Sequence, residues 1–446
     1  MKVSTYIWWI VFVLLISCDS SSKIGEPEVP EEPGIDIPDP VSQSRSAKRG
    51  VSFNFDTTRD IDLLAKGISW SYNWGPDQIE RYDQPFQNNE MDFCPMAWNG
   101  IDANKLRAYK ARNPQCKYLL AFNEPNLTDQ ANMTPGEAAE KWKEVKTIAT
   151  ELGLKVISPA MNYGTLPGYG DPIVWLDEFF KLVPVSEFEG IAIHCYMSWP
   201  SATKSYIERF KKYGKPIWMT EFCAFEGELT PTMQMKYLSD IVNYMESDPM
   251  IARYAWFIPR GDEGVNDYPY MFLLNKAQPA GLTPLGEVFV NMSSLDRNIY
   301  YVQNQIIEAE HYAASCISEG VGKDGWVDGP SLQPTTDPEG GILELVNFTK
   351  GMWVEYQVEM FQTANHDIQL RYAATLDSKV VIKLDGDVDN IVITLPATGV
   401  TENVWNTISR PIPMTTGKHT LRLEVIQGRI CLNRLKIGTI FKNGRS

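Results

Sequence analysis

Short apolar runs alternate with amphipathic segments between residues 48 and 295. The clearest helix signal is Thr134 followed three positions later by Glu137, a pairing that caps a helix N-terminus, and Gly153 is typical of the end of that helix. Thr230 precedes a second amphipathic stretch. Because apolar runs stand on both sides of these segments, the pattern predicts repeated strand–helix units.

Eight of the apolar runs have the length of β-strands. Strands of a buried parallel sheet read as nearly continuous apolar runs. The candidates are residues 50–54, 67–73, 92–98, 118–123, 155–159, 190–196, 216–221 and 252–257. Eight strands alternating with helices predict a (β/α)₈ TIM barrel, whose catalytic groups lie at the C-terminal ends of its strands.

A different pattern begins near residue 300. Helical periodicity fades, and short runs are separated by turn residues such as Asp385-Gly386. The clearest runs are residues 353–358, 368–373, 380–384 and 419–425. We therefore expect a multidomain protein, with the barrel at residues 48–295 followed by a jelly-roll-like antiparallel β-sandwich at residues 300–440.

The N-terminus predicts export. Lys2 precedes an apolar stretch over residues 6–16 that suits a secretory signal better than a membrane span. The letters LISC ending at Cys18 resemble a bacterial lipoprotein signal, so we expect residues 1–18 to be a signal peptide ending in the lipidated Cys18 and residues 19–46 to be a disordered linker rich in Pro, Glu and Ser. The alternative is an uncleaved anchor helix. An exported lipoprotein would lie at the outer membrane, the cell surface or in the periplasm, held to the membrane by its lipid alone.

Composition narrows the partners. The chain has 446 residues, of which 43% are hydrophobic, enough for two buried cores. Its formal net charge of −15 argues against nucleic acid, since phosphate binding requires clustered Lys and Arg. His194 is the one histidine before residue 311, so a histidine-rich metal site or a Ser-His triad lacks its residues in the barrel.

Two glutamates stand where strand-like runs end. Glu124 follows YLLAFN in the fourth run, and Glu221 follows IWMT in the seventh. Glycosidic bond cleavage needs two carboxyls, one to protonate the leaving oxygen and one to attack the anomeric carbon or activate water, and in the retaining reaction they lie about 5 Å apart. The sequence predicts this pair, and the alternative is two unrelated solvated strand-end residues.

Five motifs extend this prediction: KRGVSFN at 48–54, WSYNW at 70–74, CPMAW at 94–98, LAFNEP at 120–125 and WMTEF at 218–222. Together they resemble clan A glycoside hydrolases and, within that clan, glycoside hydrolase family 128. The resemblance implies a retaining endo-β-1,3-glucanase that hydrolyses laminarin or curdlan by double displacement, without a cofactor. Glu124 would be the general acid/base and Glu221 the nucleophile.

The same resemblance assigns residues to the substrate. Asn123 would hold the sugar 2-hydroxyl, and Tyr196 would steady the nucleophile. Their alternatives are a turn residue and a buried tyrosine with a satisfied hydroxyl. Further residues expected in the cleft are His194, Asn73, Trp74, Trp98, Trp199 and Trp256.

The C-terminal region resembles carbohydrate-binding module family 6 through IEAEHY at 307–312, GMWVEY at 351–356, LDG at 384–386 and GKHTL at 417–421. This resemblance implies a structural Ca²⁺ held by Glu308 and Glu310, because oxygen ligands suit that cation. The alternative for this pair is an exposed strand face. Sugar contacts would come from Trp405 and Asn433, with Trp326 in place of a second aromatic side chain.

These inferences predict a monomeric, lipid-anchored β-1,3-glucanase whose partner is a β-glucan polysaccharide or oligosaccharide. Two alternatives remain open. One is a retaining hydrolase of another β-linked polysaccharide, and the other is a non-catalytic surface glycan-binding protein that keeps the barrel as a scaffold.

Overall fold

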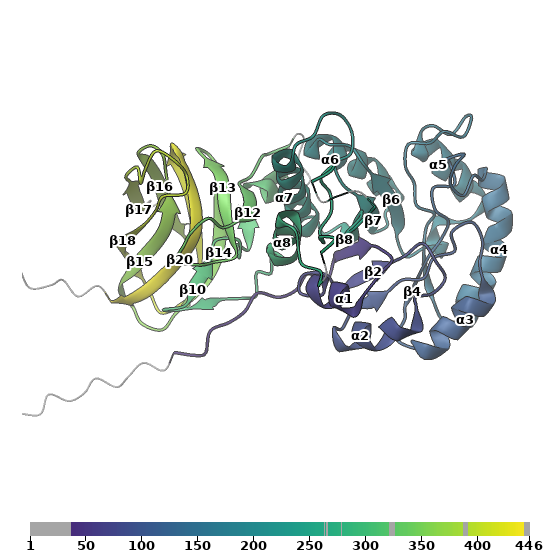
Figure 1. Ribbon diagram of the computed structural model, residues 1–446, viewed down its shortest axis with the longest axis horizontal. Helices are drawn as coiled ribbons and strands as arrows, with labels where there is room; N and C mark the ends of the chain where they lie inside the picture. The colour runs from purple at the N-terminus through teal and green to yellow at the C-terminus, as the bar shows by residue number, and fades with distance from the viewer. Residues whose placement is uncertain are drawn as a thin grey trace, which may run out of the picture. The chain divides into compact units, whose positions relative to one another are not determined.

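The computed structural model describes residues 37–262, 264, 266–277, 279–320, 326–386 and 391–440. The predicted signal peptide, with Cys18, and most of the predicted linker lie outside these residues. The described chain has an N-terminal region of parallel strands and helices and a C-terminal region rich in antiparallel strands (Figure 1). Among the described helices, none combines the length and apolar character that a membrane crossing requires.

Each of the eight predicted runs contains a strand. The strands are β1 (Arg49–Ser52), β2 (Trp70–Tyr72), β3 (Asp92–Phe93), β4 (Tyr118–Leu120), β5 (Lys155–Ile157), β6 (Ile191–Cys195), β7 (Ile217–Phe222) and β8 (Ile251–Trp256). Six form a parallel sheet in the order β3-β2-β1-β8-β7-β6, and β4 pairs with β5. Parallel bridges from Met96 to Leu120 and from Ile157 to Gly190 join this pair to both edges of the sheet. The eight strands therefore form one circuit, and the residues that follow them meet at one rim.

Helices alternate with the strands and surround them in Figure 1: α1 (Thr58–Leu64), α2 (Asp83–Asn88), α3 (Ala103–Arg112), α4 (Pro135–Glu151), α5 (Pro172–Leu182), α6 (Pro200–Phe210), α7 (Pro231–Ser247) and α8 (Pro284–Asn291). The predicted capping box is confirmed, because Glu137 N donates to Thr134 Oγ1 at 3.3 Å and Thr134 N donates to Glu137 Oε2 at 2.8 Å. Thr230 caps α7. Short 3₁₀ helices are η1 (Glu80–Tyr82), η2 (Val185–Glu187), η3 (Lys211–Tyr213) and η4 (Cys316–Gly320).

Aromatic side chains fill the interior near the N-terminal ends of the strands. A Cβ at Gly50 would lie 2.5 Å from the Trp70 indole, and one at Gly190 would lie 2.7 Å from the Trp218 indole. The two glycines thus make room for the two rings. The Arg253 guanidinium lies over both, 5.4 Å from the Trp70 ring centre and 5.1 Å from that of Trp218. This packing closes the end of the strand circuit opposite the rim.

The described residues of the C-terminal region form twelve strands in two sheets, and the four predicted runs lie in β14, β15, β16 and β19. One sheet has the order β12-β13-β20-β15-β18 with β10 on β20, and the other β11-β14-β19-β16-β17 with β9 on β14. The strands are β9 (Tyr301–Val302), β10 (Ile306–Glu308), β11 (Ala314–Ser315), β12 (Ser331–Pro334), β13 (Leu343–Thr349), β14 (Trp353–Met360), β15 (Ala364–Ala373), β16 (Ser378–Leu384), β17 (Ile391–Leu395), β18 (Trp405–Met414), β19 (Gly417–Gln427) and β20 (Arg429–Ile440). Alternate residues of β19 are buried, as expected for strands with one face on a core.

Residues 41–46 differ from the disordered linker that the sequence predicts. Gln305 Nε2 donates to Val41 O at 2.6 Å, and Arg45 Nη1 donates to Asn89 O at 2.6 Å. Backbone carbonyls accept these bonds. Because such bonds do not require a particular side chain on the accepting residue, the sequence pattern does not show that residues 41–46 are held against the rest of the protein.

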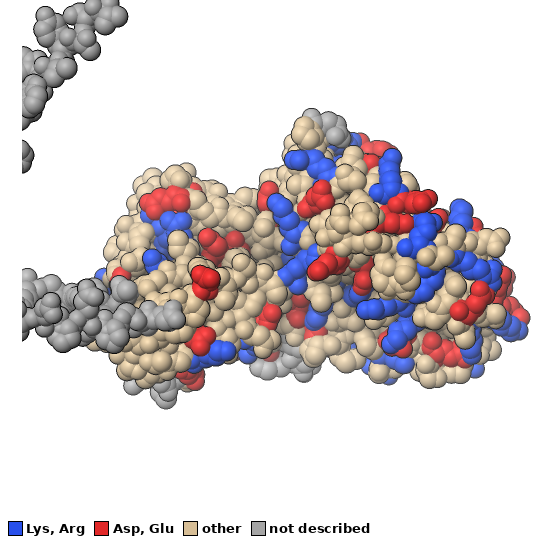
Figure 2. All heavy atoms as spheres, turned by 90° about the horizontal axis from the view of Figure 1, so that it is seen from below, with Lys and Arg blue, Asp and Glu red and all other residues tan. Residues whose placement is uncertain are grey.

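Charged side chains of both signs are intermixed on the face shown in Figure 2. Surface ion pairs such as Arg107–Glu151, with nitrogen and oxygen 2.7 Å apart, bring opposite charges together. On that face the formal excess of acidic residues does not form one continuous acidic surface.

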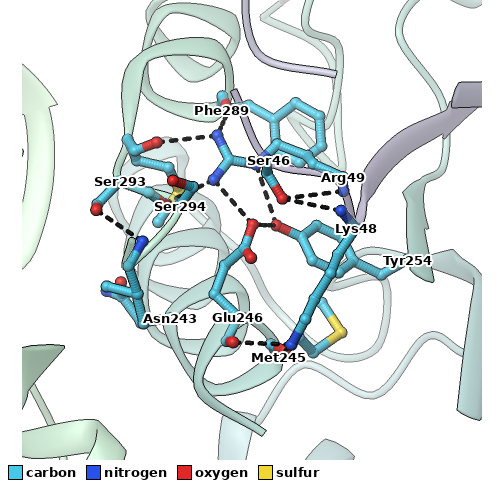
Figure 3. Close-up of polar contacts among 12 residues, drawn as sticks. Ser46, Lys48, Arg49, Asn243, Met245, Glu246, Tyr254, Phe289, Ser293 and Ser294 are labelled. Atoms are coloured by element: carbon cyan, nitrogen blue, oxygen red, sulfur yellow. Dashed lines mark hydrogen bonds and ion pairs between the residues drawn. The ribbon is translucent and has the colours of Figure 1, made fainter. Parts of the chain in front are cut away.

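The buried Arg49 side chain joins β1 to three other elements (Figure 3). Its guanidinium donates to the carbonyls of Phe289 at 2.7 Å and Ser293 at 2.8 Å, at and beyond the end of α8. It also donates to Glu246 Oε1 of α7 at 3.2 Å and to the Tyr254 hydroxyl of β8 at 3.0 Å. The Arg49 guanidinium thus donates to carbonyl groups at the end of α8 and holds α7 and α8 against the sheet.

Replacing Arg49 with Met should lower the free energy of unfolding by about 3–5 kcal/mol, because Glu246 would stay buried without its cation. Urea denaturation of Arg49→Met and of the exposed control Arg107→Met measures the difference. The control should be unchanged within error. Equal stability of the two variants would contradict the role given to Arg49.

Candidate active site

The carboxyl groups of Glu124 and Glu221 enter one pocket at the rim. Glu124 follows β4, and Glu221 is the fifth residue of β7. One carboxylate oxygen of each lies within 4.8 Å of the other, and both residues are largely buried. Two carboxyls at this spacing can act on the same bond, one as proton donor and the other as nucleophile.

Three side chains donate hydrogen bonds to Glu221. Tyr72 Oη donates to Oε1 at 2.8 Å, Trp74 Nε1 donates to the same oxygen at 2.7 Å, and the Tyr196 hydroxyl donates to Oε2. Burial and the charge of Glu221 raise the pKa of Tyr72 and of Tyr196 well above the ordinary value, so both hydroxyls keep their protons. The three donors fix the orientation of the Glu221 carboxyl group.

Glu124 has different neighbours. Asn162 Nδ2 donates to Glu124 Oε1 at 3.1 Å, and His194 Nδ1 lies 2.9 Å from the same oxygen. The backbone φ of Glu124 is +44°, a left-handed conformation that costs a non-glycine residue on the order of 1–2 kcal/mol. A hydrogen bond from Glu124 N to Ala160 O at 3.0 Å holds this conformation and turns the side chain toward the pocket.

His194 lies between the two carboxyls and is fully buried. Its Nδ1 is 3.4 Å from Glu221 Oε2. Burial lowers the pKa of His194, but the charge of Glu221 and the hydrogen bond with Glu124 raise it above the ordinary value. Burial by itself would raise the pKa of Glu124, but the charge of His194 lowers it to below the ordinary value. Each group therefore favours the charged form of the other.

The pocket has a volume of about 800 Å³. Its aromatic lining consists of Trp74, Trp98, Tyr196, Phe225 and Phe257. Its acidic lining consists of Glu124, Asp129, Glu221 and Glu226. Among the described residues that line it, none is Lys, Arg or His.

Four residues expected to contact substrate line this pocket: Asn123, Trp74, Trp98 and Tyr196. Asn123 Nδ2 donates to Gln130 Oε1 at 3.2 Å, and its buried Oδ1 has no hydrogen-bond partner among the described residues. An unpartnered amide oxygen in the pocket wall is suited to accept a hydroxyl proton.

Three expected residues lie elsewhere. Trp256 is fully buried, and its Nε1 donates to Met271 O at 2.8 Å. Trp199 is 65% exposed and caps α6, away from the pocket lining. Asn73 closes a turn, in which Gly75 N donates to its Oδ1 at 3.0 Å. A position at a strand end does not fix the direction of the side chain, because successive side chains of a strand point to opposite faces.

Tyr72 and Asn162 are contacts of the two glutamates that the sequence did not assign. Tyr72 lies inside the WSYNW motif and within a predicted strand, not beyond its end. Asn162 follows the fifth predicted run by three positions. Glu124 and Asn162 are both polar side chains just beyond a predicted strand. The same criterion therefore identifies Asn162.

In the C-terminal region, Asn433 is fully buried beneath residues 337–341. Its Nδ2 donates to Asp337 Oδ2 at 2.7 Å and to Gly340 O at 2.8 Å. A Cβ on Gly341 would lie 2.4 Å from Asn433 Oδ1, so this loop lies directly on the amide. In this conformation Asn433 cannot reach a sugar.

The two tryptophans assigned to this module have separate surroundings. Trp405 is partly exposed, and its Nε1 donates to Thr336 Oγ1 at 3.2 Å. The ring contact of Trp326 is with Tyr244 of α7, with the ring centres 6.0 Å apart. Trp326 thus contacts the N-terminal region rather than completing an aromatic pair with Trp405.

Glu308 and Glu310 fit a cation. Glu310 is fully buried, which differs from the alternative of an exposed strand face. Oε2 of each residue is buried without a hydrogen-bond partner among the described residues. Burial raises the pKa of Glu308 and raises that of Glu310 to about 8. A hard cation would supply a partner for the buried Oε2 atom of each carboxylate.

Comparison with known proteins places these features in context. A model of the family described as glycosyl hydrolase catalytic core matches residues 50–289. A model of carbohydrate binding module (family 6) matches residues 324–438. The first match covers the pocket and both glutamates, and the second covers most of the antiparallel sheets.

Two similar proteins each match about half of this chain. The crystal structure of a GH128 (subgroup II) endo-β-1,3-glucanase from Pseudomonas viridiflava is 34% identical with a TM-score of 0.51, over 56% of this chain and 98% of that chain. Alkali-sensitive linkage protein 1 of Schizosaccharomyces pombe is 26% identical over 260 residues, which cover 56% of this chain and 45% of that protein. The chain therefore spans less than half the length of this curated relative.

Proposed function

Because the chain belongs to the glycosyl hydrolase catalytic core family, we propose that it is a retaining endo-β-1,3-glucanase that hydrolyses laminarin or curdlan. The observation that carries the proposal is the pair Glu124 and Glu221, with carboxylate oxygens within 4.8 Å. This spacing supports retention, since inverting enzymes separate their carboxyls by about 6.5–9.5 Å. The GH128 endo-β-1,3-glucanase, matched over 98% of its chain, supports the substrate class.

The two steps follow from the contacts of each carboxyl. Glu221 attacks the anomeric carbon, the glycosidic bond breaks, and Glu124 gives its proton to the leaving oxygen. In the second step Glu124 takes a proton from water, which attacks the same carbon and releases Glu221. Trp74 and the two tyrosines hold Glu221 in the attacking orientation throughout.

The charge of the pocket favours a neutral glycan. Four acidic side chains line it, and Lys, Arg and His are absent from its described lining. A sulfated or uronate chain would meet like charges at close range. Aromatic side chains offer faces on which neutral sugar rings can stack.

We extend the proposal to the rest of the chain. The closed circuit of strand pairings supports a (β/α)₈ barrel for the N-terminal domain. The sequence supports export as a lipoprotein through Cys18, which lies outside the described residues. The two unpartnered carboxylates support Glu308 and Glu310 as ligands of a structural Ca²⁺. Two pocket glutamates in catalytic geometry favour a hydrolase over a non-catalytic binding protein.

Replacing Glu221 with Gln should lower kcat on laminarin by at least about 10³-fold, because the amide cannot form the glycosyl ester. Reducing-sugar release measures kcat, and calorimetry with laminarihexaose should show retained binding. Glu226→Gln, a change of another glutamate in the pocket lining, is the matched control and should keep most of its activity. Full activity of Glu221→Gln would exclude Glu221 as nucleophile.

Replacing His194 with Gln should move the basic limb of the kcat/KM profile to lower pH. Burial lowers the pKa of His194, but Glu221 and Glu124 raise it above the ordinary value, so the imidazole keeps a proton beside Glu124 as the pH rises. Without the imidazole, Glu124 alone must retain the proton and loses it earlier. Initial rates on laminarin across the pH range check this. A basic limb that stays in place would show that His194 does not share the acid proton.

Ca²⁺ should raise the unfolding temperature of the protein, and chelation should reverse the effect. Because burial raises the pKa of Glu310 to about 8, Ca²⁺ must displace a proton, and the shift should grow with pH. Calorimetry of the wild type and Glu310→Gln measures it, with Mg²⁺ as the control cation. A Ca²⁺ response that persists in Glu310→Gln would contradict the assignment.

A further inference from the structure

We propose that Asn162 is a positioning residue for Glu124 and that Asn126 holds Asn162 in place. The inference rests on the proposed function, because it assigns both side chains to the acid/base step of that reaction. Asn126 does not line the pocket, so it would act through its neighbour rather than on the substrate.

Asn162 reaches Glu124 from the loop after β5. Its Nδ2 donates to Glu124 Oε1 at 3.1 Å, and its Oδ1 accepts a hydrogen bond from Tyr163 N at 2.8 Å. The second bond fixes the orientation of the amide, because it engages the oxygen with the backbone. Asn162 therefore faces Glu124 as a donor.

Asn126 ties the loop after β4 to the loop after β5. It is fully buried, and its Nδ2 donates to Asn162 O at 2.7 Å and to Tyr169 O at 3.3 Å. Its backbone oxygen accepts from Thr165 N at 3.0 Å and from Leu166 N at 2.9 Å. Four hydrogen bonds from one residue thus set the position of the loop that carries Asn162.

Gly164 allows the two loops to meet this closely. A Cβ at this position would lie 2.4 Å from both Nδ2 and O of Asn126 and 2.5 Å from Tyr169 O. Any side chain here must push the loops apart. Gly164→Ala therefore disturbs the contact between Asn126 and Asn162 without changing a group that lines the pocket.

The consequence concerns which oxygen of Glu124 transfers the proton. Among the described contacts of its carboxyl group, those of Asn162 and His194 both end on Oε1. Oε2 is thus left for the leaving glycosidic oxygen in the first step and for water in the second. Asn162 opposes the rotation that would exchange the two oxygens.

The dependence of kcat/KM on the leaving group tests the inference, because this constant reports the steps up to the glycosyl-enzyme. Asn162→Ala and Gly164→Ala should lose about tenfold or more on laminarin, whose leaving alcohol needs protonation. On 2,4-dinitrophenyl β-laminaribioside, whose leaving group needs little protonation, both should stay near the wild type. The basic limb of Asn162→Ala should also move to higher pH, since a hydrogen bond to the charged form of Glu124 is lost.

Two further variants sharpen the test. Asn162→Asp keeps the side-chain volume but removes the donor, so it should repeat the loss. Asn113→Ala removes a buried amide from the loop before β4, at the opposite strand ends, and should leave the leaving-group dependence unchanged. Equal losses on every substrate with an unmoved pH limb would overturn the positioning role. Inactivity of the wild type on both substrates would instead overturn the proposed function.

Discussion

The site depends on keeping two buried carboxyls within 4.8 Å of each other in different surroundings. Two carboxylates at this distance repel each other, so each needs favourable partners of its own. Glu221 accepts hydrogen bonds from Tyr72, Trp74 and Tyr196, whereas Glu124 contacts His194 and Asn162. The two glutamates are chemically identical, and their neighbours alone give them separate roles.

The fold places these neighbours by bringing strand ends together. Glu221 belongs to β7, His194 to β6 and Tyr72 to β2, while Glu124 follows β4, so four parallel strands each supply one group. The opposite end of the strand circuit is filled by aromatic rings and a guanidinium, which leaves the functional groups at the rim. Catalytic geometry and stability are thus concentrated at opposite ends of the same strands.

Features that follow from local sequence patterns could be predicted, whereas features that depend on contacts between distant residues could not. The eight strands and the two glutamates follow local rules, since apolar runs and strand-end carboxyls are visible in a linear pattern. The direction of Trp256 is not local, because it depends on which face of β8 meets α8. The burial of Asn433 depends on a loop almost a hundred residues away in sequence, and Asn162 acquires its role only by meeting Glu124 in space.

Trapping the covalent intermediate tests whether Glu221 is the nucleophile. A 2-deoxy-2-fluoro-β-laminaribiosyl fluoride should inactivate the enzyme, because the fluorine slows the breakdown of the glycosyl-enzyme more than its formation. Mass spectrometry of the digested protein should then find the added disaccharide on the peptide that contains Glu221. A label on the Glu124 peptide, or inactivation without any covalent label, would contradict the account.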